Sequence, residues 1–183
     1  MANNAKAIAA AGAGTLALIA AAAPFVAQWE GLRTDPYLDI ASVATVCYGE
    51  THVEMRSYTK AECDAMLQRS LASHGGAILQ SIPESAPTSV KLAFISLAYN
   101  MGPANIAASE AAKAARAGDY PKACANFAQW NLVKVKSERE WQQCPVSRRR
   151  VGVKTKQRYC VSPGLVNRRA AETKLCLSDQ IRS

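Results

Sequence analysis

An apolar stretch without a charged residue covers residues 7–27 and directly follows Lys6. It holds 21 residues, of which eleven are alanine. The strongly apolar members are Ile8, Leu16, Leu18, Ile19, Phe25 and Val26. A helix rises about 1.5 Å per residue, so this segment would be about 31 Å long, which matches a hydrocarbon core of roughly 30 Å. The positive charge in front of it predicts an N-terminus in the cytoplasm and the rest of the chain outside.

This segment is weakly hydrophobic for an anchor. Its six strongly apolar side chains contribute only about −2 to −4 kcal/mol to insertion, so insertion should be marginal and reversible. Two other interpretations stay open, a permanent anchor and a cleaved signal peptide. Pro24 directly follows the alanine tract and disfavours cleavage there. We expect residues 1–28 to form a weakly hydrophobic anchor segment and residues 29–183 to form one domain.

Beyond this segment, apolar positions recur mostly at helical spacing. Thr59 and Glu62 form a capping-box pattern that opens a helix to about His74. Further helices are expected over residues 87–100, 104–117 and 121–130. Residues 38–46 favour a short β-hairpin within a small sheet near residues 39–58. The expected fold class is α+β, mostly helical with a small antiparallel sheet.

Two carboxylates and a threonine lie in or near this hairpin. Glu30 precedes it, and Asp39 and Thr45 lie within it, so the chain can fold both back beside Glu30. Cleavage of a glycosidic bond requires two carboxyl groups, one protonated and one ionised. A threonine hydroxyl can hold an attacking water. The alternative interpretation is that Glu30 and Asp39 are solvated charges near a turn.

The surroundings of these three residues resemble the phage-type lysozymes of glycoside hydrolase family 24. The resemblance rests on Trp-Glu-Gly at 29–31, Asp-Pro-Tyr-Leu-Asp-Ile at 35–40 and Thr-Val-Cys-Tyr-Gly at 45–49. It implies that Glu30 is the general acid, while Asp39 and Thr45 position the water. We expect Glu30 to lie in an apolar setting next to Trp29 that keeps it protonated. The implied reaction is inverting hydrolysis of the β-1,4 bond between N-acetylmuramic acid and N-acetylglucosamine of peptidoglycan during host lysis, without metal or cofactor. A lytic transglycosylase and a non-enzymatic membrane permeabiliser are the alternatives.

Three further residues are candidates for substrate contact. The sequence Tyr-Asn-Met-Gly at 99–102 resembles the family's Asn-x-Gly corner along the sugar cleft, which makes Asn100 a candidate, although such a sequence also ends ordinary helices. Glu50 and His52 follow the hairpin, and Glu50 departs from the Gly-His-Thr that the family often has there. Either side chain could instead be simply exposed. Residues 163–172 resemble the family's C-terminal Gly-Leu-x-x-Arg-Arg-x-x-Glu helix, whose main role should be packing.

The N-terminal segment resembles that of the signal-arrest-release endolysins, whose anchor first tethers the enzyme and later leaves the membrane. The resemblance implies transient contact with the host inner membrane through residues 7–27. The enzyme would face the periplasm while tethered and would be soluble there after release. The freed segment would then pack on the domain and help to build the active site.

Six cysteines form an even set without a Cys-x-x-Cys pair, and the chain has only two histidines, which argues against a structural zinc site. In an exported protein such cysteines predict disulfides. Six cysteines allow fifteen connectivities. Among these we favour Cys47–Cys63, Cys124–Cys176 and Cys144–Cys160.

Positive charge is concentrated in the C-terminal third. The net charge of the chain is +8, and from Lys134 onward thirteen basic residues stand against four acidic ones. An anionic cell wall or bilayer fits this distribution better than nucleic acid, because no nucleic-acid-binding motif accompanies the charge, and a merely solvated basic face is the alternative. We expect residues 131–163, with their Arg-Arg-Arg at 148–150, to be a basic disulfide-closed loop near the cleft mouth that contacts the wall. The protein is expected to act as a monomer.

Overall fold

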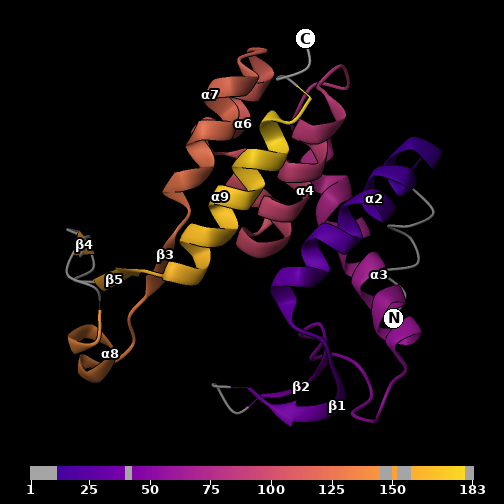
Figure 1. Cartoon of the computed structure of the whole chain (residues 1–183), viewed down its shortest axis with the longest axis vertical. Helices are drawn as coiled ribbons and strands as arrows, with labels where there is room; N and C mark the ends of the chain where they lie inside the picture. The colour runs from indigo at the N-terminus through magenta and orange to yellow at the C-terminus, as the bar shows by residue number, and fades with distance from the viewer. Residues whose placement is uncertain (1–11, 40–42, 145–149, 152–157, 180–183) are drawn as a thin grey trace.

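The described part of the apolar N-terminal run lies, from Ala13 onward, in helix α2 (Ala13–Glu30), which packs against α3 (Lys60–Leu79) and α4 (Thr88–Met101) (Figure 1). The computed structural model describes residues 12–39, 43–144, 150–151 and 158–179. The residues of α2 that are buried in the main core are Ile19, Ala22, Ala23 and Val26. The helix is continuous across the boundary expected at residue 28, so its last turn leads directly into the domain. Within the described ranges, no helix is long and apolar enough to span a membrane.

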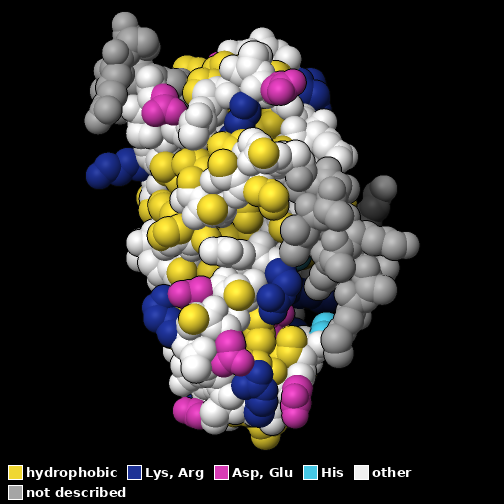
Figure 2. Space-filling view, turned by 90° about the vertical axis from the view of Figure 1, so that its right-hand side faces the viewer, with side chains coloured by type: hydrophobic (Ala, Val, Ile, Leu, Met, Phe, Trp, Pro, Cys, Tyr) yellow, Lys and Arg dark blue, Asp and Glu magenta, His cyan; other side chains and the backbone are white. Residues whose placement is uncertain are grey.

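The outward face of α2 is apolar as well. Its exposed residues between positions 16 and 24 are Leu16, Ala17, Ala20, Ala21 and Pro24. Figure 2 faces the side of the molecule on which α2 and α3 lie, and it shows hydrophobic side chains gathered over the middle of this face. A surface helix normally carries polar residues on its outer side. α2 therefore presents apolar groups both to the core and away from it.

The predicted hairpin is confirmed as a two-stranded antiparallel sheet of β1 (Arg33–Leu38) and β2 (Ala44–Cys47). Tyr37 lies opposite Thr45 in the register. The sheet begins earlier than residue 38 and does not extend to residue 58, because the described chain after β2 forms only an isolated bridge between Val46 and Glu50. The sheet follows α2 directly and lies beyond its C-terminal end (Figure 1).

Helix α3 begins where the capping box predicts. Thr59 accepts a hydrogen bond from the backbone N–H of Glu62, and Glu62 reaches back to the backbone of Thr59. The predicted end at His74 is wrong, because the helix continues through Gly75 and Gly76 to Leu79. A Cβ at Gly75 would lie 3.4 Å from Ile95 and 3.5 Å from Ile19. This glycine is therefore a close-packing position where α2, α3 and α4 meet, rather than a helix stop.

Helix α4 is buried through most of its length and forms the centre of the main core. The single helix expected over 104–117 is divided into α5 (Pro103–Ala107) and α6 (Glu110–Arg116), because the Ser109 side chain caps a new helix by accepting from the N–H of Ala112. The next helix is likewise divided, into α7 (Tyr120–Ala125) and the 3₁₀ turn η1 (Asn126–Gln129). Helix α9 (Pro163–Leu177) packs across α4 and closes the core (Figure 1).

Residues 131–163 are not the irregular loop that we expected. They contain β3 (Leu132–Lys134), α8 (Glu138–Gln142), β4 (Arg150–Val151) and β5 (Arg158–Val161). The strands form an antiparallel sheet in the order β3-β5-β4. A small separate core joins Val135, Cys144 and Cys160, with Trp141 packed against it. The unit lies beside the N-terminal end of α9, away from the β1–β2 sheet (Figure 1), while Arg148 and Arg149 fall outside the described residues.

Three disulfides are present, and they are the three pairs that we favoured. Cys47–Cys63 joins β2 to α3, Cys124–Cys176 joins α7 to α9, and Cys144–Cys160 closes the 131–163 unit. Each restricts the unfolded chain, most strongly for the pair that is separated by 52 residues. The disulfides thus connect the hairpin to α3 and hold α9 against α7.

Candidate active site

Glu30 stands at the C-terminal end of α2, where the chain turns into the hairpin. The turn is made by Gly31, whose φ of 68° lies in the left-handed region that favours glycine. The side chain of Glu30 is 20% exposed, so its carboxylate is accessible from one side. Nη1 of Arg168 donates a 2.7 Å hydrogen bond to its Oε1. The apolar surrounding expected for Glu30 is therefore wrong in one respect, because a guanidinium contacts the carboxylate.

A buried ionic network on α9 supports this contact. Arg168 also donates from Nε to Oε1 of Glu172 at 3.2 Å, and Nε of Arg169 lies 2.7 Å from Oε2 of the same glutamate. Ser96 of α4 donates to Glu172 at 2.6 Å. Burial raises the pKa of Glu172, and the arginines act in the opposite direction. Burial also lowers the pKa of Arg169, against the effect of Glu172.

The same network reaches Asn100. Nη2 of Arg169 donates to Oδ1 of Asn100 at 3.2 Å, so α9 contacts both Glu30 and Asn100. The sequence predicts mainly a packing role for the motif on α9, and no pattern in it indicates that Arg168 contacts Glu30. The available signal was the Arg-Arg-x-x-Glu spacing, which places the three charges within one turn of a helix. A buried turn of this kind needs partners from other elements.

Glu30 lines a cleft with a volume of about 330 Å³. Four elements or their connections line it: Glu30 from α2, Tyr48, Gly49 and Glu50 after β2, Ser70 and His74 from α3, and Tyr99 and Asn100 from α4. The structure thus brings together three of the predicted site residues, Glu30, Glu50 and Asn100. The lining is polar and can form hydrogen bonds with a sugar.

Asp39 and Thr45 lie on the hairpin and do not line this cleft. Oδ1 of Asp39 accepts from the N–H of Val43 at 2.8 Å, and the Thr45 hydroxyl donates to the carbonyl oxygen of Val43 at 2.9 Å. Both side chains are thereby fixed on the backbone of one residue. Thr45 is 3% exposed, and its oxygen retains acceptor capacity because its hydrogen is directed to Val43.

The two histidines lie in different positions from those expected. His52 is exposed and does not line the cleft, whereas His74, interpreted as a helix-terminal residue, does. Nδ1 of His74 lies 2.8 Å from the carbonyl oxygen of Ser70. A carbonyl oxygen only accepts, so Nδ1 carries the hydrogen and Nε2 is the nitrogen left for the cleft. The His74 ring also meets Tyr99 edge-on, with the ring centroids 5.5 Å apart.

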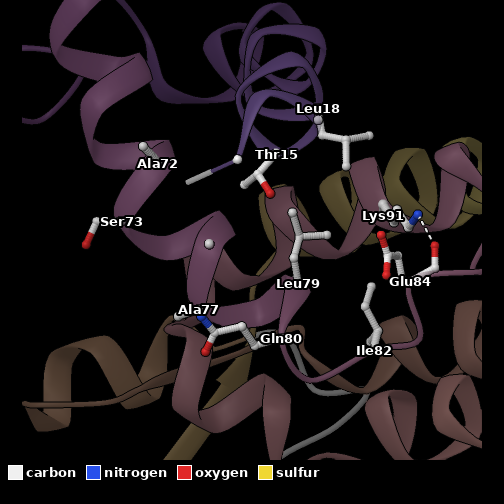
Figure 3. Close-up of a pocket in the computed structure, with 13 residues that line it drawn as sticks. Thr15, Leu18, Ala72, Ser73, Ala77, Leu79, Gln80, Ile82, Glu84 and Lys91 are labelled. Atoms are coloured by element: carbon white, nitrogen blue, oxygen red, sulfur yellow. Dashed lines mark hydrogen bonds between the residues drawn. The ribbon is translucent and has the colours of Figure 1, made fainter. Parts of the chain in front are cut away.

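A larger hollow of about 680 Å³ lies between the first turns of α2 and the C-terminal half of α3 (Figure 3). Its lining includes the small or apolar residues Thr15, Leu18, Ala72 and Leu79. Lys91 donates there to the backbone oxygen of Glu84. None of the predicted site residues lines it. Size therefore does not identify the active site, and the smaller cleft holds the convergent polar groups that a reaction requires.

A mostly helical domain whose first long helix ends in a glutamate, beside a small hairpin and a polar cleft, defines a lysozyme-type glycoside hydrolase. Residues 27–172 match the phage lysozyme family. The chain belongs to this family, within the group of the SAR-endolysins. It is 31% identical over 154 residues to the SAR-endolysin of Enterobacteria phage P21, covering 82% of this chain and 79% of the relative.

Other relatives and solved structures agree. The SAR-endolysin of Pseudomonas phage phiKMV is 32% identical over 163 residues, which cover 88% of each chain. The endolysin from Escherichia coli O157:H7 phage FAHEc1 has a TM-score of 0.71 at 22% identity and covers 86% of this chain and 91% of its own. The active form of the P1 phage endolysin Lyz has a TM-score of 0.65 at 22% identity, and the match covers 87% of this chain and 84% of that one. At these identities the two structures show the lysozyme-like fold.

Proposed function

We propose that this lysozyme hydrolyses the β-1,4 bond between N-acetylmuramic acid and N-acetylglucosamine in peptidoglycan, with Glu30 as the general acid. The observation that carries the proposal is the position of Glu30, at a helix end, partly exposed to a polar cleft and held by Arg168. A carboxyl group held in one orientation can deliver its proton to the leaving oxygen of a bound sugar. No other described carboxylate of the cleft is fixed by a buried cation.

Asp39 and Thr45 position the attacking water in this proposal. Their common attachment to Val43 supports it, because it fixes both oxygens relative to each other. Water that attacks from the face opposite the acid inverts the anomeric carbon, which in such enzymes accompanies a carboxyl separation of about 6.5–9.5 Å. Glu50 and Asn100 bind the sugar from the cleft wall, while the exposure of His52 gives its proposed role less support.

The N-terminal segment regulates the enzyme by leaving the membrane. Residues 7–27 tether the chain to the host inner membrane facing the periplasm, and release gives the soluble periplasmic enzyme. Two observations on α2 support this: its inward face is part of the main core, and its outward face is apolar. A helix of this kind has apolar contacts to gain in either location. The domain with α2 packed against α3 and α4 then corresponds to the released state.

The experiment combines Glu30→Gln with product analysis. Purified wild-type protein should release reducing muramic acid ends from peptidoglycan, and Glu30→Gln should reduce the rate by at least about 100-fold because it removes the proton donor. Glu54→Gln is the matched control, since Glu54 is a strongly exposed glutamate outside the cleft. Anhydro-muramic ends would identify a lytic transglycosylase instead. Full killing by Glu30→Gln would identify a non-enzymatic permeabiliser.

A further inference from the structure

One wall of the cleft is a tight turn that directly follows β2. Tyr48, Gly49 and Glu50 line the cleft from this turn. The turn is closed by two backbone hydrogen bonds, from the N–H of Val46 to the carbonyl oxygen of Glu50 at 3.0 Å and in the reverse direction at 2.9 Å. Cys47 within it has a φ of 59°, in the left-handed region that residues other than glycine seldom adopt. Such a conformation persists only where surrounding contacts hold it.

Two neighbouring contacts attach this turn to α3. Cys47 forms a disulfide with Cys63, and the Tyr48 hydroxyl donates a 2.8 Å hydrogen bond to Oδ1 of Asp64. Consecutive residues of the turn therefore meet consecutive residues of the helix. The disulfide fixes Cys47, whereas the direction of the chain after it depends on the contact of Tyr48. Tyr48 is only 5% exposed, so its hydroxyl needs a partner within the protein.

Asp64 is well suited to be that partner. Nζ of Lys60, one helical turn earlier, donates to its Oδ2 at 2.6 Å and so orients the carboxylate. The hydrogen bonds from Lys60 and then from Tyr48 lower the pKa of Asp64, while burial and then the bond to Asp64 raise the pKa of Tyr48. At neutral pH the phenol therefore keeps its proton, and the ionised carboxylate accepts it in a hydrogen bond. Asp64 lies outside the described lining of the cleft, so it can affect a bound sugar only through Tyr48.

We propose that Asp64 is a positioning residue, which acts through the Tyr48 hydroxyl to hold the turn after β2 in the arrangement that binds the sugar. The inference rests on the proposed function, because it takes this cleft as the sugar-binding site. The proton donor of that proposal, Glu30, lies on α2, so a loosened turn should weaken sugar binding and leave proton transfer largely intact. The far end of the turn has its own contact with α3, since the Ser70 hydroxyl donates to Glu50 at 2.8 Å. Loss of the bond between Tyr48 and Asp64 therefore loosens the turn without detaching it.

The test is steady-state hydrolysis of soluble, uncross-linked glycan strands prepared from peptidoglycan, measured below the melting transition of every variant. Tyr48→Phe and Asp64→Ala should each raise KM by about 3- to 10-fold, as for the loss of one hydrogen bond, with kcat within about twofold of wild type. The double variant should match the single ones, because all three lack the same contact. Asp64→Asn keeps an oxygen acceptor and should bring KM back to within about twofold of wild type. Glu110→Ala, which removes an exposed carboxylate paired with Lys113 on α6, is the matched control.

The outcomes separate this inference from the proposed function. If Tyr48→Phe raises KM and Asp64→Ala does not, the hydroxyl acts on the sugar directly and the inference is overturned. If the two increases multiply in the double variant, or if Asp64→Asn raises KM as much as Asp64→Ala, the hydrogen bond is not responsible, which overturns it as well. If Glu30→Gln retains wild-type hydrolysis, the proposed function itself fails, and that result is visible before any variant of the turn is compared.

Discussion

Replacement of Arg168 by glutamine tests how the active site is held together. The side chain of Arg168 is 5% exposed and bridges two carboxylates, at 2.7 Å from Glu30 and 3.2 Å from Glu172. Glutamine is shorter and neutral, so both contacts lose their charge. The substitution leaves Glu172, which is fully buried, with Arg169 as its remaining cationic partner among the described residues.

The expected loss of stability follows from the exposure of the two carboxylates. Removal of one partner of a buried ion pair costs about 3–5 kcal/mol. The lower end applies here, because Glu30 is 20% exposed and can be hydrated, while Glu172 keeps Arg169 and Ser96. We therefore expect a loss of about 3 kcal/mol, equivalent to a fall of about 6–12 °C in melting temperature for a chain of this size. Hydrolysis should fall as well, since Glu30 loses the group that orients it.

Thermal and urea unfolding of wild type, Arg168→Gln, Glu30→Gln and the double variant measure both effects. The double-mutant cycle should give a coupling energy on the order of 1–2 kcal/mol between the two positions. Arg56→Gln is the matched control, because Arg56 also forms a 2.8 Å ion pair, with Glu62, but on the exposed surface. It should melt close to wild type. A melting temperature of Arg168→Gln within about 2 °C of wild type would refute the buried network as a source of stability.

Three further predictions concern packing, pH and wall binding. Gly75→Val should destabilise by about 1–3 kcal/mol in urea unfolding because Ile95 and Ile19 lie against the site; Gly76→Val, where the structure leaves space, should cost less, and equal losses would contradict the packing argument. The raised pKa of Tyr99 makes its neutral form a source of stability that is present below pH 10 and lost at higher pH, so Tyr99→Phe should lose stability less steeply above pH 10; parallel curves would be the opposing result. Replacement of the three arginines at 148–150 by glutamine should weaken peptidoglycan binding mainly at low salt, and unchanged sedimentation with peptidoglycan would exclude their role.

Local signals predicted the elements whose causes are local. The capping box at Thr59 opens α3 because both of its hydrogen bonds lie within four residues of chain. The C-terminal end of α3 could not be predicted in the same way. Gly75 is a position of close packing against α2 and α4, whereas a glycine in the sequence alone indicates a turn. The sheet of the 131–163 unit was missed because β3, β4 and β5 have three, two and four residues, too few for a periodic pattern.

In the candidate site, too, the residues with a local sequence signal were predicted and the long-range contact was not. Glu30 and Asn100 belong to stretches that resemble family motifs, and Glu50 directly follows such a stretch but departs from the family pattern. The fold brings all three to one cleft, and their chemical roles remain predictions. The sequence does not predict that Arg168 is the hydrogen-bond partner of Glu30. Arg168 lies 138 residues further along the chain, and its side chain could equally have been a solvated charge on α9. Only the packing of α9 across α4 decides between these two environments.

The charges around Glu30 connect catalysis with the proposed release. On α9, two arginines and one glutamate leave one positive charge in excess within a buried cluster, and the Glu30 carboxyl group accepts a hydrogen bond from one of these arginines, Arg168. In the proposed tethered state, Glu30 follows the membrane segment by only a few residues and cannot reach Arg168. The cluster then keeps an uncompensated cation, which is unfavourable in a buried setting. Docking of α2 brings the Glu30 carboxyl group to Arg168 as a hydrogen-bond acceptor, so in this proposal the same step completes both the buried cluster and the active site.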